Sequence, residues 1–221
     1  MAWIAKAARS SVGSKVLMSI SGLAMVGFLF GHLAGNLLMF GGPEAINTYA
    51  ESLHSMPLVV WATRLILLVM IVVHIKTAKR LTVINRQAKP QKYAVQHAIK
   101  TTLPAKTMFP TGLFLFVYIA YHLAHYTFKI TNPEFDKLDH HDVYSMVLLG
   151  FQNSWISLFY IVAMLCLGMH LVHGFRSAFQ TLGVNHPKYQ KIVTLSGPIV
   201  AVVVAGGFIS IPISIMAGLI R

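Results

Sequence analysis

Five long apolar stretches divide the chain, and the shorter segments between them carry nearly all of its charge. Each stretch is longer than the about 20 residues that a helix needs to cross the ~30 Å hydrocarbon core of a bilayer. Backbone polar groups find no water in that core, so each stretch is expected to be helical. The pattern predicts an all-α integral membrane bundle of five transmembrane helices, at approximately residues 16–40, 57–79, 108–129, 154–177 and 197–219.

Composition agrees with this interpretation. The chain has 221 residues, of which 56% are hydrophobic and only 11% charged, whereas soluble domains have about a quarter charged residues. The length allows one bundle, so we expect residues 1–221 to form a single transmembrane domain. The first stretch follows a basic N-terminus, as in a signal peptide, but it is too long for that and is interpreted as a retained helix.

Cysteine usage limits the cofactors that the chain can hold. Its single cysteine, Cys166, lies inside the fourth stretch, and the sequence has no CxxCH motif. Any haem would therefore be bound without thioether links, and any iron–sulfur cluster would belong to another chain.

Lysine and arginine lie mostly on one side of the predicted bundle. Of 18 basic residues, 14 fall in segments 1–15, 76–107 and 176–196, which share one side. The positive-inside rule then places the N-terminus in the cytoplasm and the C-terminus outside. All six acidic residues fall on the outer side: Glu44, Glu51, Glu134, Asp136, Asp139 and Asp142. The basic face has two possible explanations. It reflects the positive-inside rule alone, or it also forms a docking surface for a cytoplasmic partner. Such sidedness argues against nucleic acid as the explanation of the net charge of +12.

The histidines carry the main chemical information. Ionisable groups inside a bilayer are costly, so each one is a functional candidate. Six of the 11 histidines lie in the apolar stretches: His32, His74, His122, His125, His170 and His173. The other five are expected to be solvated loop side chains: His54, His97, His140, His141 and His186.

Depth sorts four of these histidines into two pairs. At 1.5 Å per residue, His32 and His122 lie roughly 24 and 21 Å from the inner ends of their helices, and hence in the outer half. His74 and His170 lie roughly 24–26 Å from the outer ends of theirs, and hence in the inner half. Two histidines at one depth on different helices suit a haem iron with two axial imidazoles.

Two further histidines compete for these roles. His125 and His173 lie one turn after His122 and His170 on nearly the same helix faces, so spacing alone leaves them open as ligands. Otherwise they would bond haem propionates or line a quinone site.

Glycines accompany two of the paired histidines. They either leave the backbone bare for a macrocycle or allow close helix packing. The residues are Gly31, Gly35, Gly168 and Gly174.

Several motifs in a fixed order give the chain a resemblance to a known family. They are SSVGSKVLMSISGL, GHLAGNLLMF, GGPEAINTYAESLHSMP, VVHIKTAKRL, YIAYHLAHYTF and MHLVHGFRSAFQTLGVNHP. From Ser11 to about Pro187 the chain resembles the single-subunit, dihaem cytochrome b anchors (b558 type) of succinate dehydrogenases and fumarate reductases. The resemblance implies that the axial ligands of two non-covalent b haems are His32 with His122 (outer haem) and His74 with His170 (inner haem).

The resemblance also implies partners and a place in the cell. A flavoprotein subunit with FAD and an iron–sulfur subunit would dock on the cytoplasmic face. The anchor would carry electrons between them and a membrane quinone, usually menaquinone, in the cytoplasmic membrane of a prokaryote, and whole complexes often form dimers. The quinone would bind toward the outer side, where Glu51 and His54 are the nearest candidates. Arg64 would pair with a haem propionate or extend toward the interface.

Two other functions fit parts of the pattern. The chain could be a cytochrome b subunit of a formate dehydrogenase or hydrogenase type, but those place their soluble partner outside. It could also be a haem-free transporter with histidine proton relays. The only stretch that looks breakable, with Gly206, Gly207 and Pro212, has no histidine. No Gly-rich phosphate loop or Ser–His–Asp set is present, so chemistry on a soluble substrate is assigned to other chains.

Overall fold

The computed structural model describes residues 10–88, 101–139 and 141–221. The structure is 86% helical, with no strand in the described part. Seven residues that entered the sequence analysis lie outside the described ranges: Lys6, Arg9, Lys89, Lys92, His97, Lys100 and His140.

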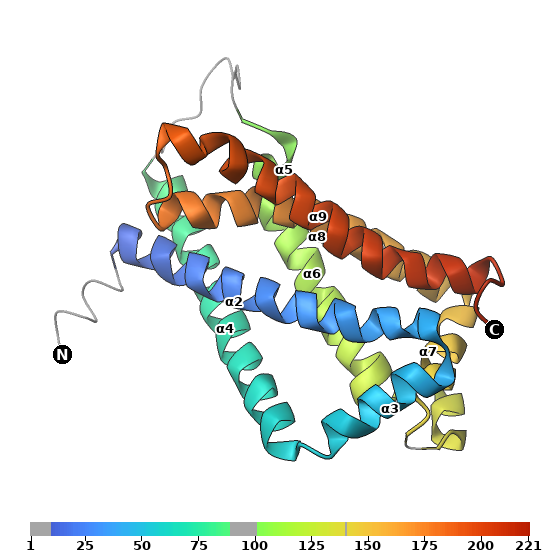
Figure 1. The fold of residues 1–221 in the computed structure, drawn as a ribbon. Coiled ribbons are helices and arrows are strands. Elements are labelled where there is room, and N and C mark those ends of the chain that lie inside the picture. The colour runs from blue at the N-terminus through green and yellow to red at the C-terminus, as the bar shows by residue number, and fades with distance from the viewer. Residues whose placement is uncertain (1–9, 89–100, 140) are drawn as a thin grey trace.

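Five long apolar helices dominate the fold (Figure 1). They are α2 (Ser11–Leu37), α4 (Pro57–Gln87), α6 (Met108–His122), α8 (Ser154–Thr181) and α9 (Pro187–Met216). Helix α2 continues into a 3₁₀ turn, η1 (Leu38–Gly41), and α6 into a π-helical turn, η2 (Leu123–Thr127). The shorter elements are α3 (Pro43–His54), α5 (Leu103–Lys106), η3 (Pro133–Lys137) and α7 (Val143–Gln152). These results confirm an all-α chain with five helices able to cross a membrane.

Two helices extend past the ends of the predicted apolar stretches, because polar turns continue each helix beyond its apolar part. Helix α4 continues to Gln87 rather than ending near residue 79, and α9 begins at Pro187 rather than near residue 197. Proline at the first position suits both starts, because its missing N–H has no partner there in any case. An apolar pattern marks the part of a helix that crosses lipid, which is shorter than the helix itself.

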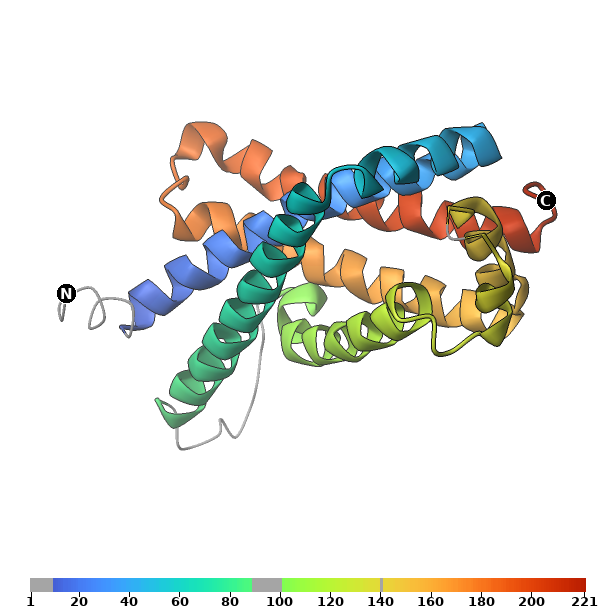
Figure 2. The ribbon, with the colours of Figure 1, turned by 90° about the horizontal axis from the view of Figure 1, so that it is seen from below.

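The helices pack around α2 and α8. Helices α8 and α9 lie antiparallel, α6 packs on α8, and α2 contacts α4, α8 and α9. The centre of the bundle is filled by Val26, Leu171, Ala201 and Val204. Helix α4 lies at the edge, packed mainly on α2 (Figures 1 and 2), and none of the residues in its most apolar window is buried.

One end of the bundle is closed by hydrogen bonds between segments distant in sequence. Asn47 on α3 donates to Asp142 Oδ1 at 3.2 Å and accepts from the Tyr144 backbone N–H at 2.9 Å. The Tyr144 hydroxyl donates to the Arg221 carbonyl at 3.0 Å. Hydrogen bonds from Ser145 and Asn47 lower the pKa of Asp142 from its ordinary value. Helices α3 and α7 therefore lie together with the C-terminus, opposite the start of α2 (Figure 1).

Candidate functional site

Four histidines from four long helices meet as two pairs inside the bundle. The rings of His32 (α2) and His122 (α6) have centroids 6.0 Å apart, inclined at 79°. The rings of His74 (α4) and His170 (α8) are 6.3 Å apart, inclined at 57°. These are the same pairs that the depth argument predicts. An iron bound by two imidazole nitrogens at about 2 Å each holds the ring centroids roughly 6 Å apart.

Backbone and hydroxyl oxygens hold the inner pair through the δ nitrogens. His74 Nδ1 lies 3.2 Å from the Met18 carbonyl oxygen and 3.3 Å from Ser21 Oγ, both on α2. His170 Nδ1 lies 3.3 Å from Thr111 Oγ1 on α6. Both rings thus bond to a neighbouring helix through the nitrogen that a metal ligand usually leaves for an outer partner.

The directions in which the Ser21 and Thr111 hydroxyls donate indicate which ring nitrogen of His74 and of His170 carries the proton. Ser21 Oγ donates to the Leu17 carbonyl at 2.8 Å, and Thr111 Oγ1 donates to the Thr107 carbonyl at 2.6 Å. The Met18 carbonyl can only accept, so His74 Nδ1 carries the proton. With the Thr111 proton on the Thr107 carbonyl, Thr111 accepts from His170, and we assign the same tautomer to that ring. The ε nitrogens of His74 and His170 then carry lone pairs, as metal binding requires.

Two glycines give the inner rings room to approach the backbone. A Cβ atom at Gly22 would lie 3.3 Å from His74 Cε1, and one at Gly112 would lie 3.3 Å from His170 Cε1. Both distances are tighter than ordinary van der Waals contact. Any side chain at either position would press directly on the ring.

The glycines singled out from sequence have other neighbours. A Cβ at Gly35 would clash with the Tyr49 ring of α3, one at Gly168 would meet Ala205 of α9, and one at Gly174 would lie 3.8 Å from Met108 Cε. Gly35 and Gly168 thus serve helix packing, and of these four glycines Gly31 alone faces open space.

Aromatic side chains surround the outer pair. His32 stacks on Phe28 at 5.2 Å and lies 5.7 Å from Phe208. His122 stacks on Tyr118 at 5.8 Å, and its Nδ1 lies 3.4 Å from the Tyr160 hydroxyl. The outer pair therefore lies in an apolar, aromatic environment with one hydroxyl directed at His122.

His32 has a different outer partner. Asn36 Nδ2 lies 3.4 Å from His32 Nδ1 and donates to the His32 carbonyl at 2.7 Å. An amide nitrogen only donates, so in this orientation Nδ1 would accept. The His32 carbonyl can only accept, so it fixes the amide in this orientation. Iron on Nε2 of His32 would therefore require the Asn36 side chain to move away from Nδ1.

The two competing histidines are directed elsewhere. His125 is fully buried, its Nδ1 lies 3.0 Å from the Tyr160 hydroxyl, and its ring stacks on Phe135 at 5.4 Å. His173 Nε2 lies 3.1 Å from Ser177 Oγ on its own helix. Neither ring contacts a histidine of the opposite helix within the described part of the chain, so the geometry favours His122 and His170 as the paired rings.

The remaining predicted residues lie outside the bundle interior. Glu51 and His54 are exposed on α3, and the His54 ring lies 6.1 Å from that of His141. Arg64 is exposed on α4, with its guanidinium carbon 5.1 Å from the Trp61 ring centroid. The structure thus separates these three from the histidine pairs and stacks Arg64 on the helix surface.

The donor set distinguishes a haem from a bare metal ion. Among the residues that the structure describes, no group of three or more His, Cys, Asp or Glu side chains could hold an ion. A bare zinc ion takes three or four protein ligands, whereas a haem iron needs two, because the porphyrin supplies the other four. Two pairs of facing rings fit the two axial positions of a haem iron, and they do not fill the ligand set of a bare ion.

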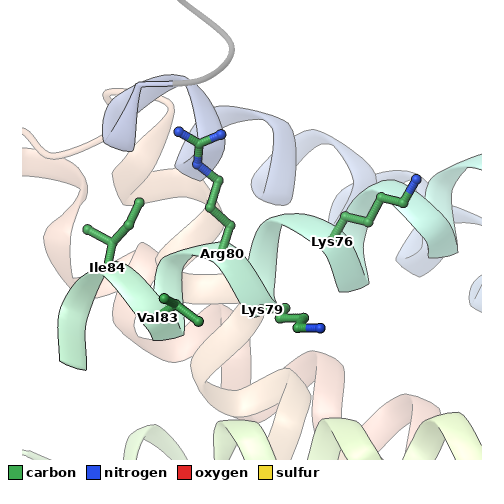
Figure 3. A pocket seen from close by; sticks show the side chains of 5 residues that line it. All are labelled: Lys76, Lys79, Arg80, Val83 and Ile84. Atoms are coloured by element: carbon green, nitrogen blue, oxygen red, sulfur yellow. The ribbon is translucent and has the colours of Figure 1, made fainter. Parts of the chain in front are cut away.

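The cytoplasmic-facing half of α4, by the predicted orientation, carries a basic hollow. It is lined by Lys76, Lys79, Arg80, Val83 and Ile84 (Figure 3). Spacings of three and four residues place these side chains around one stretch of helix surface. The hollow combines positive charge with exposed apolar atoms at the end of a span.

Sequence reasoning missed the residues that hold the rings. Ser21–Gly22 on α2 and Thr111–Gly112 on α6 repeat one pattern, a hydroxyl residue followed by glycine, near the inner ends of two helices. That repeat was visible in the sequence, and the structure shows that each copy contacts one inner histidine.

Comparison of the chain with models of protein families, with curated proteins and with solved structures finds no match.

Proposed function

We propose that this chain is the dihaem cytochrome b anchor and electron-transfer subunit of a succinate:quinone oxidoreductase or quinol:fumarate reductase. The observation that carries the proposal is the meeting of four intramembrane histidines as two pairs at bis-imidazole separation. Two inner rings with protonated δ nitrogens support it further. Catalysis on the soluble substrate would reside on other chains.

Each pair has a defined role in this proposal. His74 and His170 would hold the inner haem, and His32 and His122 the outer one. Bound b haems would supply one-electron carriers within the membrane. The chain's own contribution is to fix the imidazole orientation, through Ser21 and other partners, and to exclude water from the outer pair with aromatic side chains.

The basic surface supports the orientation and the partners. Cytoplasmic placement of the Lys- and Arg-rich segments follows from the positive-inside rule, and puts the hollow on α4 at the cytoplasmic interface (Figure 3). A flavoprotein with FAD and an iron–sulfur subunit would dock on that side. A formate dehydrogenase or hydrogenase type of anchor would use the same pairs with its partner outside. The proposed location is the cytoplasmic membrane of a prokaryote.

The quinone site is proposed at the outer end, near Glu51 and His54. Both are exposed on α3, where a headgroup can approach from the interface. Menaquinone is the quinone that the family resemblance implies. Replacing Glu51 with Gln should impair quinone reduction while both haems are retained.

Haem content tests the proposal directly. The purified chain should give a dithionite-reduced minus oxidised spectrum of b type, with two haems per chain by pyridine haemochrome. His74→Ala and His170→Ala should each lose one haem, and neither substitution should disturb the outer pair. A well-folded preparation without haem would overturn the proposal and favour proton-relay histidines.

A further inference from the structure

Tyr160 links His122 to a buried histidine that has no place in the proposed electron transfer. Its hydroxyl oxygen lies 3.0 Å from His125 Nδ1 and 3.4 Å from His122 Nδ1. The Tyr160 side chain is buried, and His125 has no exposed surface at all. One hydroxyl of α8 therefore bridges two histidines of the α6–η2 segment.

One arrangement of protons makes both contacts of the bridge hydrogen bonds and uses the Tyr160 proton, if His122 binds iron. Iron on Nε2 leaves the proton on His122 Nδ1, which then donates to the Tyr160 oxygen. The single hydroxyl proton is free to be donated to His125 Nδ1, so His125 carries its own proton on Nε2. That ε nitrogen is buried without a hydrogen-bond partner in the described structure.

An orphaned buried N–H is costly, which indicates that the ring is held in this orientation by its other contacts. Phe135 stacks on one side of His125, and Tyr126 lies with its centroid 4.2 Å away. The π-helical turn η2 starts directly after His122 and carries His125. Such turns are frequent at functional sites.

We infer that Tyr160 and His125 form a positioning relay for the outer haem ligand. His125 Nδ1 accepts a hydrogen bond from the Tyr160 hydroxyl, and the Tyr160 oxygen thereby becomes a stronger acceptor for His122 Nδ1–H. This inference rests on the proposed function. Hydrogen bonds in a chain polarise one another, so each bond strengthens the next. A stronger acceptor on Nδ1 raises the basicity of the ligating nitrogen. A more basic imidazole ligand stabilises the oxidised form of the haem iron relative to the reduced form.

Among the described residues, the inner pair lacks such a relay. Thr111 and Ser21 give their protons to backbone carbonyls of their own helices, so no second histidine polarises them. The two sites are therefore held by different hydrogen-bond arrangements, and the relay acts on the outer site alone.

Redox titration of the loaded protein tests the relay. Tyr160→Phe keeps the ring and removes the hydroxyl, so the oxidised/reduced equilibrium of the outer haem should shift about three- to tenfold toward the reduced form. A tenfold shift corresponds to about 59 mV for one electron. Tyr118→Phe is the matched control, because Tyr118 also stacks on His122 while its hydroxyl makes no hydrogen bond to that ring in the described structure. It should leave both potentials unchanged.

A pair of substitutions at His125 separates positioning from packing. His125→Leu removes the acceptor and should shift the outer potential in the same direction as Tyr160→Phe. His125→Asn places an acceptor close to the position of Nδ1 and should restore the wild-type potential. This pair decides the question if Tyr160→Phe fails to fold.

The outcomes distinguish the two proposals. Wild-type protein without two haems refutes the proposed function. Two haems in the wild type, with an outer potential that neither Tyr160→Phe nor His125→Leu changes, refutes the relay alone. Equal shifts of the outer potential in His125→Leu and His125→Asn would also refute it, because only packing would then matter.

Discussion

Thr111→Val offers a direct test of how the inner histidines are held. Thr111 is 5% exposed and its Oγ1 lies 3.3 Å from His170 Nδ1. Valine has nearly the same shape, so the substitution removes the acceptor and leaves the packing in place. The Thr111 proton already goes to the Thr107 carbonyl, and the change therefore deprives His170 of an acceptor rather than a donor.

The structure gives the size of the expected effect. Without Thr111, the protonated δ nitrogen of His170 would be buried and unsatisfied, which costs about 1–3 kcal/mol. That cost falls on the tautomer that binds iron, so haem affinity at the inner site should fall roughly 10- to 100-fold, the range seen when outer partners of metal ligands are removed.

Competition for haem by an apo-globin measures the affinity at each site. The inner site should release its haem first in Thr111→Val, while the outer site is unchanged. Thr107→Val is the matched control, since Thr107 directly precedes α6 and its hydroxyl bonds only to backbone carbonyls of α5. Unchanged affinity at the inner site in Thr111→Val would refute the assigned tautomer.

Three further predictions concern other parts of the molecule. His173→Ala should retain both haems by pyridine haemochrome, because His173 bonds Ser177 instead of facing His74; loss of a haem would make it the ligand in place of His170. Asp142→Ala should lower the unfolding temperature by removing the N-cap of α7, at a cost of about 1 kcal/mol. The pKa of Asp142 is lowered in the folded state, so its contribution is present at neutral pH and is lost as pH falls through that lowered pKa. A pH series of thermal unfolding, compared between wild type and Asp142→Ala, should show the difference shrink in acid, and a constant difference would contradict it. Hydrogen exchange should show α4 as the least protected of the long helices without haem and more protected with it; equal protection in both forms would contradict the proposed site.

The pairing of histidines by depth could be obtained from sequence because membrane helices have a fixed rise and a fixed direction of crossing. Position along the chain then converts into height, and His32 and His122 come out level without knowledge of packing. Rotation about the helix axis is not fixed in this way. His125 is one turn from His122, and only the contacts of Tyr160 and Phe135 show which way it points.

The roles of the glycines also depend on rotation about the helix axis, which the sequence does not fix. The sequence leaves two roles open for Gly35, room for a cofactor or helix packing, because it lies close to His32. Its neighbour is Tyr49, carried by a short helix that folds back after the first span. Gly22 and Gly112 are distant in sequence from the histidines that they face. Contacts between helices decide what a small residue accommodates, and sequence adjacency does not.

Hydrogen bonds to the histidine δ nitrogens link the long helices to one another in pairs. Helix α2 supplies Ser21 to His74 of α4, α6 supplies Thr111 to His170 of α8, and α8 supplies Tyr160 to His122 of α6. Helix α4 receives such a bond and supplies none to the other three rings. Its apolar window is also unburied in the bundle, so its rotation is fixed by its packing on α2, through buried Thr77 and Leu81, together with the polar contact at His74. The His74 ring of α4 lies about 6 Å from its partner ring on α8. A group that bridges these two rings would therefore restrict the motion of α4. The edge position that leaves the apolar window of α4 unburied therefore makes the inner pair the place where binding would add most order.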